Sequence, residues 1–472
     1  MKLISKSAPF KLLAVLLSLF GTVFAVLHIS LADARRESLI EITDFCHQFY
    51  FAGHMVANGL GHDLYPPLSA TAVVGSPPDL YAHKLLTSFE SRYALPFVYF
   101  PVVAVIAMPF AGLPFRQGLV AWQLTAIAFL FASCILASFS QARYKKWACS
   151  LFLFLSASLL FPLVQTVVIG QTSILFGLFP LSLGAFFLLK KRYLASGFSF
   201  ALLFLKPQLL VSLALILVIK VLPQRLSLDP FCNLKSGLKP CLIPDGDGKT
   251  ELSAEEKERT INHAMLLAGM VSGCLAILVA SGFVAGFDFL PRWLHMIQLG
   301  LANMQANDYN FYYAQMTSLV GSLLMVVPGT LTGPVRAAGY LLSFILLSAF
   351  ALYVRRVERA NLPEEEKLAF ELSIGLLMLP LIVPYIRLYD LTVFLLPAWL
   401  LSFSASPGKL NKLIAGLATA FVLALDVYYL ALTAALSVAQ TSGAKLVLLA
   451  LLVALIFTIH ERFKIREQET AL

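Results

Sequence analysis

The sequence predicts an all-α membrane protein that crosses the bilayer many times. Of the 472 residues, 59% are hydrophobic and only 13% are charged, whereas about 25% of a soluble domain is charged. The mean hydropathy is +0.82. Apolar blocks of the length needed to cross a bilayer core, roughly 20 residues, recur from end to end. These observations exclude a soluble enzyme, a fibrous protein, a disordered chain and a protein with a single anchor.

The first apolar block, residues 10–31, follows Lys2, Lys6 and Lys11. It is too long for a typical signal-peptide core, so we expect a retained helix with a cytoplasmic N-terminus. Lys206-Pro207 interrupts one of the later blocks and is expected to divide it into two short segments that meet near the outer side. The later spans are expected at residues 118–140, 147–164, 173–189, 194–222, 261–287, 334–354, 366–386, 388–404, 409–431 and 444–460.

Two further apolar stretches, 96–113 and 314–328, are expected to be re-entrant or interfacial. If they crossed the membrane, basic clusters such as Lys190-Lys191-Arg192 would face outward, against the positive-inside rule. The remaining blocks give about twelve helices with both termini inside. On this topology 25 of the 35 Lys and Arg residues are cytoplasmic, so the net charge of +9 records orientation rather than affinity for nucleic acid.

We expect residues 1–472 to form one integral membrane domain. Its first outer loop, with juxtamembrane helices, covers 32–95, its cytoplasmic loop 223–260 and its second outer loop 288–328. Eight residues separate Cys232 from Cys241, and there is no second pair, so a zinc site is not indicated. No metal site is expected.

The first outer loop holds the most distinctive polar group. Asp44, His47 and Gln48 fall at helical spacing, so one helix face presents a carboxylate, an imidazole and an amide. Tyr50 follows and suits the membrane interface, where aromatic side chains are common. An isolated aspartate in such a loop is more often a solvated interfacial residue, and that interpretation stays open.

Other polar residues are expected at membrane depth or at its outer edge. Ionisable groups there are costly and tend to face a wet cavity. Lys206 could instead snorkel or bind a carbonyl, and Arg387 with Asp390 could form a structural i,i+3 pair. All of these residues map to one face of the membrane, which favours a functional site. They are Arg92, Gln171, Lys206, Asn303, Gln305, Asn310, Arg387, Tyr389 and Asp390.

The order of short motifs along the chain resembles a known family. Asp44-Phe45 comes first, followed by Tyr50-Phe-Ala-Gly53, Leu64-Tyr65, Pro96-Phe-Val-Tyr-Phe-Pro101, Gly170-Gln-Thr-Ser173, Lys206-Pro207 and Tyr389-Asp390. This order resembles glycosyltransferase family 87, whose members are GT-C membrane enzymes that use polyprenyl-phosphate sugars. The resemblance covers most of residues 10–400. The chain departs from it at Thr172-Ser173, where many relatives have an asparagine, and in its longer inner loop.

The resemblance implies a GT-C helical bundle and an inverting hexosyltransferase, with mannose as the favoured sugar. The polyprenyl-phosphate sugar would be a substrate, with no cofactor, and a glycolipid or glycan would accept the sugar at the outer face of the bacterial cytoplasmic membrane. Asp44 matches the catalytic acid of the class. Lys206, Arg387 and Arg92, in that order, would bind the donor phosphate. Sugar or acceptor contacts would come from His47, Gln48, Tyr50, Gln171, Asn303, Gln305, Asn310, Tyr389 and Asp390.

Three other classes remain open. A polymerase or ligase that joins lipid-linked oligosaccharides would share the topology and the arginines. A secondary transporter would also carry broken helices and intramembrane charges, but usually near the midplane and often in paired halves, which this sequence does not display. A scaffold role would leave Asp44 and Lys206 without an explanation.

Overall fold

The structure, a computed structural model, is that of an all-α membrane protein. It describes residues 43–85, 97–139, 161–221, 254–307, 316–327, 329–403, scattered positions between 413 and 428, and 438–471. Every regular element in these ranges is a helix. The β-type pairing found among them is an isolated antiparallel bridge between Met316 and Arg387.

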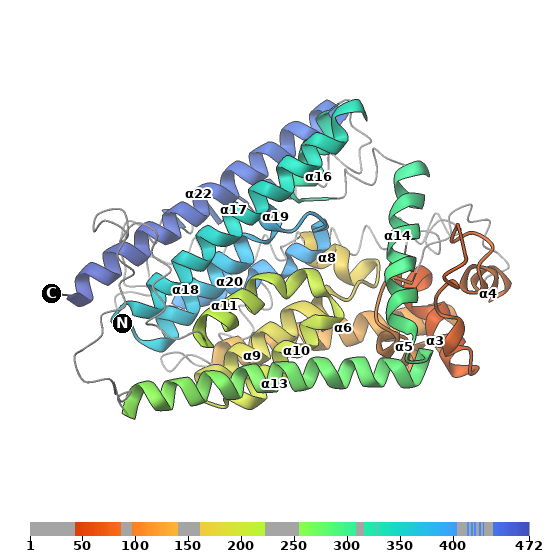
Figure 1. Ribbon diagram of the computed structural model, residues 1–472, viewed down its shortest axis with the longest axis horizontal. Coiled ribbons are helices and arrows are strands. Elements are labelled where there is room, and N and C mark those ends of the chain that lie inside the picture. Colours follow the sequence, from red (N-terminus) through yellow and green to blue (C-terminus); the bar gives the residue numbers. More distant parts are fainter. Residues whose placement is uncertain are drawn as a thin grey trace, which may run out of the picture.

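Four helices are long and apolar enough to cross a bilayer, and they correspond to four of the expected spans. In Figure 1, α13 runs along one side of the molecule, α17 and α22 run along the opposite side, and shorter helices fill the space between them. The four are α6 (Phe115–Phe139), α13 (Ala254–Ala285), α17 (Thr332–Arg359) and α22 (Val438–Ala471).

The other apolar helices are shorter. At about 1.5 Å per residue, helices of this length reach well under the roughly 30 Å of a bilayer core. The total of twelve spans therefore stays a prediction, and the expected spans 10–31, 147–164 and 409–431 lie wholly or largely outside the described residues. The shorter helices include α8 (Phe161–Val168), α9 (Phe179–Leu189), α10 (Tyr193–Ala201), α11 (Val211–Val221), α18 (Glu364–Leu377), α19 (Leu379–Ile382) and α20 (Leu395–Phe403).

The two proline-containing stretches set aside by the sequence form short helices. These are α5 (Pro101–Ala111) and α16 (Leu319–Val326), and neither is long enough to cross the membrane alone. Helix α5 packs against α3 (Phe51–Ala57), where Gly53 lies against Ala107 and Ala111. At this end of the molecule, α14 (Phe289–Asn307) rises steeply from the end of α13 in Figure 1.

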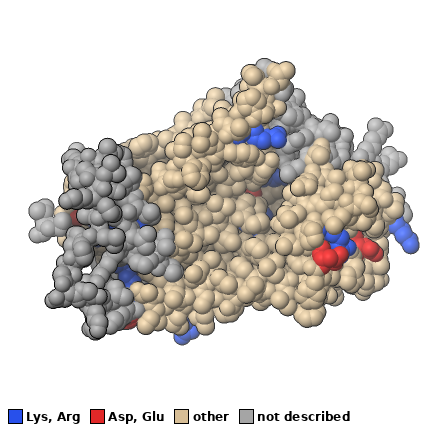
Figure 2. Space-filling model, in the orientation of Figure 1, with Lys and Arg blue, Asp and Glu red and all other residues tan. Residues whose placement is uncertain are grey.

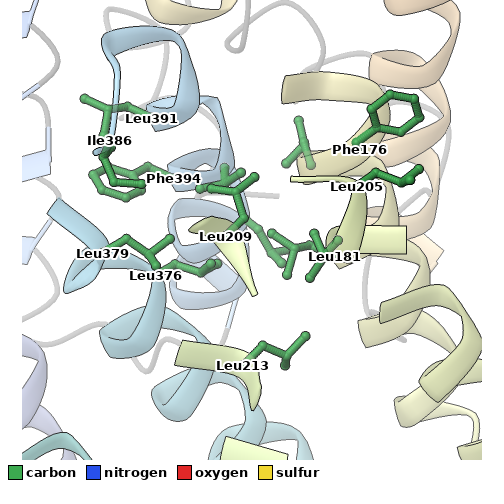
Figure 3. Close-up of a cluster of buried hydrophobic side chains, with 14 of the residues drawn as sticks. Phe176, Leu181, Leu205, Leu209, Leu213, Leu376, Leu379, Ile386, Leu391 and Phe394 are labelled. Atoms are coloured by element: carbon green, nitrogen blue, oxygen red, sulfur yellow. The ribbon is translucent and has the colours of Figure 1, made fainter. Parts of the chain in front are cut away.

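Close packing of apolar side chains holds the shorter helices together. In Figure 3, Leu209 lies between a group that includes Phe176 and Leu181 and a group that includes Leu376, Leu379 and Phe394, and Leu213 lies below Leu209. Ile386 and Leu391 belong to the second group and are 1% and 2% exposed. Because lipid is as apolar as these side chains, tight packing rather than transfer out of water stabilises the contact.

A glycine contact brings α10 against α13. A Cβ on Gly197 would lie 2.7 Å from the backbone nitrogen of Met270 and 2.9 Å from the Cα of Gly269. No larger residue fits at this crossing without moving a helix. Small residues at such contacts are typical of helix pairs in membranes.

Charged residues join four helices at one end of the bundle, in what we call the inner cluster (Lys220, Arg259, Glu358 and Glu371). The Lys220 ammonium pairs with Glu358 and lies 2.9 Å from Oε2 of Glu371, and Arg259 also pairs with Glu358. The residues come from α11, α13, α17 and α18, and Glu371 is fully buried. Figure 1 has the start of α13 and the end of α22 at this same end.

Lys220→Met should destabilise the protein by about 3–5 kcal/mol, because it leaves two buried carboxylates without their shared cation. Thermal unfolding in detergent would measure the effect, and adding Glu371→Gln should restore part of the loss. The control is Lys464→Met, which breaks an exposed pair with Glu461 and should lower the stability far less. Equal losses in the two single variants would contradict a structural role for the inner cluster.

Candidate functional site

Several of the polar residues singled out in the sequence meet where helices break. Asp44 precedes the π-helix η2 (Phe45–Tyr50), and Gly170–Ser173 link α8 to the π-helix η4 (Ile174–Leu178). Lys206 lies between the 3₁₀ turns η5 (Leu202–Leu205) and η6 (Pro207–Leu209), and Asp390 lies in the 3₁₀ helix η8 (Leu388–Phe394). Such irregular turns are frequent at functional sites. Figure 2 shows a hollow in the middle of the molecule with acidic and basic atoms at its depth.

Asp44 is half-buried and takes part in a chain of hydrogen bonds. The Gln171 side-chain amide donates from Nε2 to Oδ2 of Asp44. The Tyr99 hydroxyl donates to Oε1 of Gln171 at 3.1 Å, and the Thr172 hydroxyl donates to Tyr99 at 3.3 Å. Gln171 and Thr172 are 2% and 0% exposed, so a buried network holds the carboxylate from one side.

The backbone around Gly170 explains why Asp44 and Gln171 meet. Gly170 has a φ of +70° and ends α8, as glycine commonly does at a helix C-terminus. The Phe45 N–H donates to the Ile169 carbonyl at 3.1 Å, and the Trp122 indole N–H donates to the Gly170 carbonyl at 2.9 Å. Since Asp44 adjoins Phe45 and Gln171 adjoins Gly170, these bonds bring the two side chains together.

Lys206 forms a second polar group with Asp390 and Ser173. Pro207 cannot continue a helix, and Lys206 leaves the helical region with φ −133° and ψ 72°. Its ammonium contacts Oδ1 of Asp390 and the Ser173 hydroxyl, and Ser173 also donates to Asp390 at 3.0 Å. Both charged residues are 1% exposed. Lys206 therefore does not snorkel to the surface but belongs to a buried ion pair.

Arg387 lies beside this pair and is less deeply buried. Its guanidinium carbon is 5.9 Å from the centre of the Tyr389 ring, and the Lys206 ammonium is 4.9 Å from the same ring. Both distances suit cation–π attraction. The Arg387 N–H donates to Oδ2 of Asp390 at 3.2 Å, so Asp390 caps its own turn as well as binding Lys206. The Thr317 N–H, which donates to the Ile386 carbonyl at 2.8 Å, holds the segment in place.

Burial and neighbouring charges act in opposite directions on Asp44. Burial raises the pKa of the Asp44 carboxyl to about 6, and the positive charges of Arg387 and Lys206 offset only part of this increase. A carboxylate with a pKa near neutrality next to two cations is typical of a catalytic site. Such a group can accept a proton at neutral pH, and the cations can stabilise an anion.

The structure therefore brings together Asp44, Gln171, Lys206, Arg387, Tyr389 and Asp390 from the predicted set. Gln48 and Tyr50 have partners elsewhere. Oε1 of Gln48 accepts from the Val98 N–H at 3.2 Å, and the Tyr50 hydroxyl donates to the Leu113 carbonyl at 2.9 Å. The remaining predictions lie outside the described residues, namely Arg92 and Asn310 and the side chains of His47, Asn303 and Gln305.

Sequence reasoning did not select Tyr99, Thr172 or Ser173 as site residues. All three lie within motifs that it had noted, the Pro96–Pro101 stretch and Gly170–Ser173. Their partners are remote in the chain, since Ser173 and Asp390 are 217 residues apart. A pattern of residue types could have marked these hydroxyls as buried polar groups but not named their partners.

Comparisons of this chain with protein-family models, with curated proteins and with solved structures find no match. Within the described ranges, no three His, Cys, Asp or Glu side chains gather closely enough to hold a metal ion.

Gly170→Ala should destabilise the protein and displace Asp44. A positive φ costs an L-residue about 1–2 kcal/mol, and the added Cβ would lie 2.5 Å from Cβ of Phe45. The matched control is Gly75→Ala, where φ is +79° and nothing lies within 4 Å of the new Cβ. Melting temperatures in detergent should fall further for the Gly170 variant. Equal shifts would mean that the contact with Phe45 is not tight.

Proposed function

We propose that this chain is an inverting glycosyltransferase that moves a hexose, with mannose as first choice, from a polyprenyl-phosphate carrier to a glycolipid or glycan. The reaction would take place at the outer face of a bacterial cytoplasmic membrane. The observation that carries the proposal is the half-buried Asp44, with a pKa raised to about 6, beside the cations Arg387 and Lys206. The motif order that resembles glycosyltransferase family 87 supports the same class.

Asp44 would act as the general base. The acceptor hydroxyl gives its proton to the carboxylate while its oxygen forms a bond to the anomeric carbon of the donor sugar. The bond from that carbon to the phosphate oxygen breaks on the opposite face, so the configuration inverts. Polyprenyl phosphate leaves with the electron pair, and fixed positive charge nearby stabilises the developing anion.

Arg387 is the better placed cation for the leaving phosphate. The Lys206 ammonium is engaged by Asp390 and Ser173 and is almost fully buried. Arg387 is half-buried, and a guanidinium can bind two phosphate oxygens at once. We therefore assign the phosphate contact to Arg387. The Lys206–Asp390 pair would fix the backbone that carries it.

Secondary transport is the second candidate, and one observation favours it. The helical run from Tyr193 to Val221 is broken at Lys206, and the Lys206 ammonium pairs with Asp390 inside the protein. Transporters also form their binding sites from discontinuous helices that carry ionisable residues. A polymerase or ligase acting on lipid-linked oligosaccharides would share the chemistry described above. One preparation of the protein in vesicles can distinguish these candidates, because sugar transfer, uptake of free sugar and joining of oligosaccharide chains are measured separately.

Asp44→Asn should reduce sugar transfer at least 100-fold, since general bases typically contribute that much or more. The assay would mix purified protein with polyprenyl-phosphate mannose and candidate lipid or glycan acceptors. Asp63→Asn is the control, because Asp63 is an exposed aspartate of the same outer region. Both variants should keep the wild-type melting temperature.

Normal turnover in the Asp44 variant would contradict the mechanism. Uptake of free sugar into vesicles, without transfer to any acceptor, would favour the transporter.

Transfer should increase with pH through about 6, because only ionised Asp44 can accept the proton. Arg387→Gln removes a charge that lowers the pKa of Asp44, so the acidic limb of the pH–rate profile should move to higher pH. Arg292→Gln should leave the limb in place, because Arg292 pairs with Asp288 and is not among the charges that act on Asp44. A limb that is unchanged by Arg387→Gln would exclude Asp44 as the titrating base.

A further inference from the structure

We infer that Gln171 and Tyr99 are positioning residues for Asp44, and that Gln171 does not bind a sugar hydroxyl as the resemblance implied. Tyr99 fixes the Gln171 amide in the orientation whose N–H faces the carboxylate. This inference rests on the proposed function for its kinetic consequences, but the orientation itself can be tested without transfer.

The direction of each hydrogen bond follows from the partners of Oε1. The backbone N–H of Thr172 donates to Oε1 of Gln171 at 3.4 Å, and a backbone N–H can only donate. The Tyr99 hydroxyl points at the same atom at 3.1 Å, with its own oxygen accepting from Thr172. Two donors converge on this atom, so it is the amide oxygen. The amide nitrogen must then face Asp44.

The burial of Gln171 excludes a direct sugar contact at its oxygen. The side chain is 2% exposed, and both of its ends are engaged, Oε1 by Tyr99 and Nε2 by Asp44. A sugar hydroxyl would have to displace one of these buried partners. Each such displacement leaves a buried polar group without its bond, which is costly.

The fixed amide has two consequences for Asp44. An N–H that points at a carboxylate favours the ionised form, which opposes the effect of burial. It also occupies Oδ2. Among the described residues the hydrogen bond to this carboxylate is the one from Gln171 to Oδ2, and Oδ1 is the oxygen that we assign to accept the acceptor proton. The network thus prepares one oxygen of Asp44 for the reaction.

Tyr99→Phe tests this role, because it removes the hydroxyl that orients the amide while keeping the ring. In the variant only the longer bond from the Thr172 N–H, at 3.4 Å, still holds Oε1 of Gln171. The amide can then turn its oxygen toward Asp44, which disfavours the ionised carboxylate. The acidic limb of the pH–rate profile should move up by about 0.7 pH unit, and kcat at low pH should fall about fivefold, roughly the effect of one hydrogen bond. KM should be unchanged. Gln171→Leu should produce the same shift or a larger one.

Tyr65→Phe is the matched control. It removes a hydroxyl from another buried tyrosine, which donates to the Tyr99 carbonyl at 2.6 Å and not to Gln171. It should leave the limb in place. A limb that moves equally in both tyrosine variants, or in neither, would overturn the inference. A rise in KM for Gln171→Leu with an unmoved limb would return Gln171 to a sugar-binding role.

A spectroscopic titration separates this inference from the proposed function. Infrared difference spectra of wild type and Asp44→Asn, with isotope-labelled aspartate, report the protonation of Asp44 without any substrate. The protonated carboxyl band should appear near pH 6 in wild type and at higher pH in Tyr99→Phe. This shift without sugar transfer would overturn the proposed function alone. Transfer by wild type with identical titrations would overturn the inference alone.

Discussion

The buried ion pair between Lys206 and Asp390 is the interaction on which the site depends. Each side chain is 1% exposed, and removing either charge from water costs several kcal/mol unless a partner compensates. The two residues are 184 positions apart in the chain. Their pairing therefore fixes the break between α10 and α11 against η8. Ser173 binds the same carboxylate oxygen and adds the start of η4 to the group.

The other site residues take their places from this pair by short covalent links. Gln171 precedes Ser173 by two residues, and Arg387 precedes Asp390 by three. The donor to Asp44 and the less buried cation are thus held at fixed positions relative to the ion pair. The irregular backbone at these points is enclosed by protein, which is the condition under which such backbone is tolerated within a membrane. Longer helices on both sides of the bundle form that enclosure, and the inner cluster ties helices together at the opposite end.

The sequence predicts the class of fold because composition and block length depend only on the bilayer. It also predicts that Asp44, Lys206, Arg387 and Asp390 matter, since ionisable residues are rare among so many apolar ones. The hydrogen-bond and ion-pair partners of these residues could not be predicted from the sequence. The i,i+3 spacing left open a structural pair between Arg387 and Asp390, and in the structure the Asp390 carboxylate binds the Lys206 ammonium and the Arg387 backbone N–H. Likewise, nothing local marks Tyr99 as the partner of Gln171. The ends of helices are also hard to predict from composition. Helices α5 and α16 are as apolar as the spanning helices, so only their shorter length distinguishes them.

The anchoring of Phe45 on Ile169 and Gly170 has a consequence for motion. The positions of Asp44 and Gln171 are both set by the backbone around Ile169 and Gly170. The Phe45 N–H donates to the Ile169 carbonyl, and the Trp122 indole N–H donates to the Gly170 carbonyl. A displacement of this backbone should therefore carry Asp44 and its hydrogen-bond donor together. The distance between the two side chains is then independent of the shape of the surrounding hollow, and the Asp44 carboxylate keeps its orientation toward Gln171.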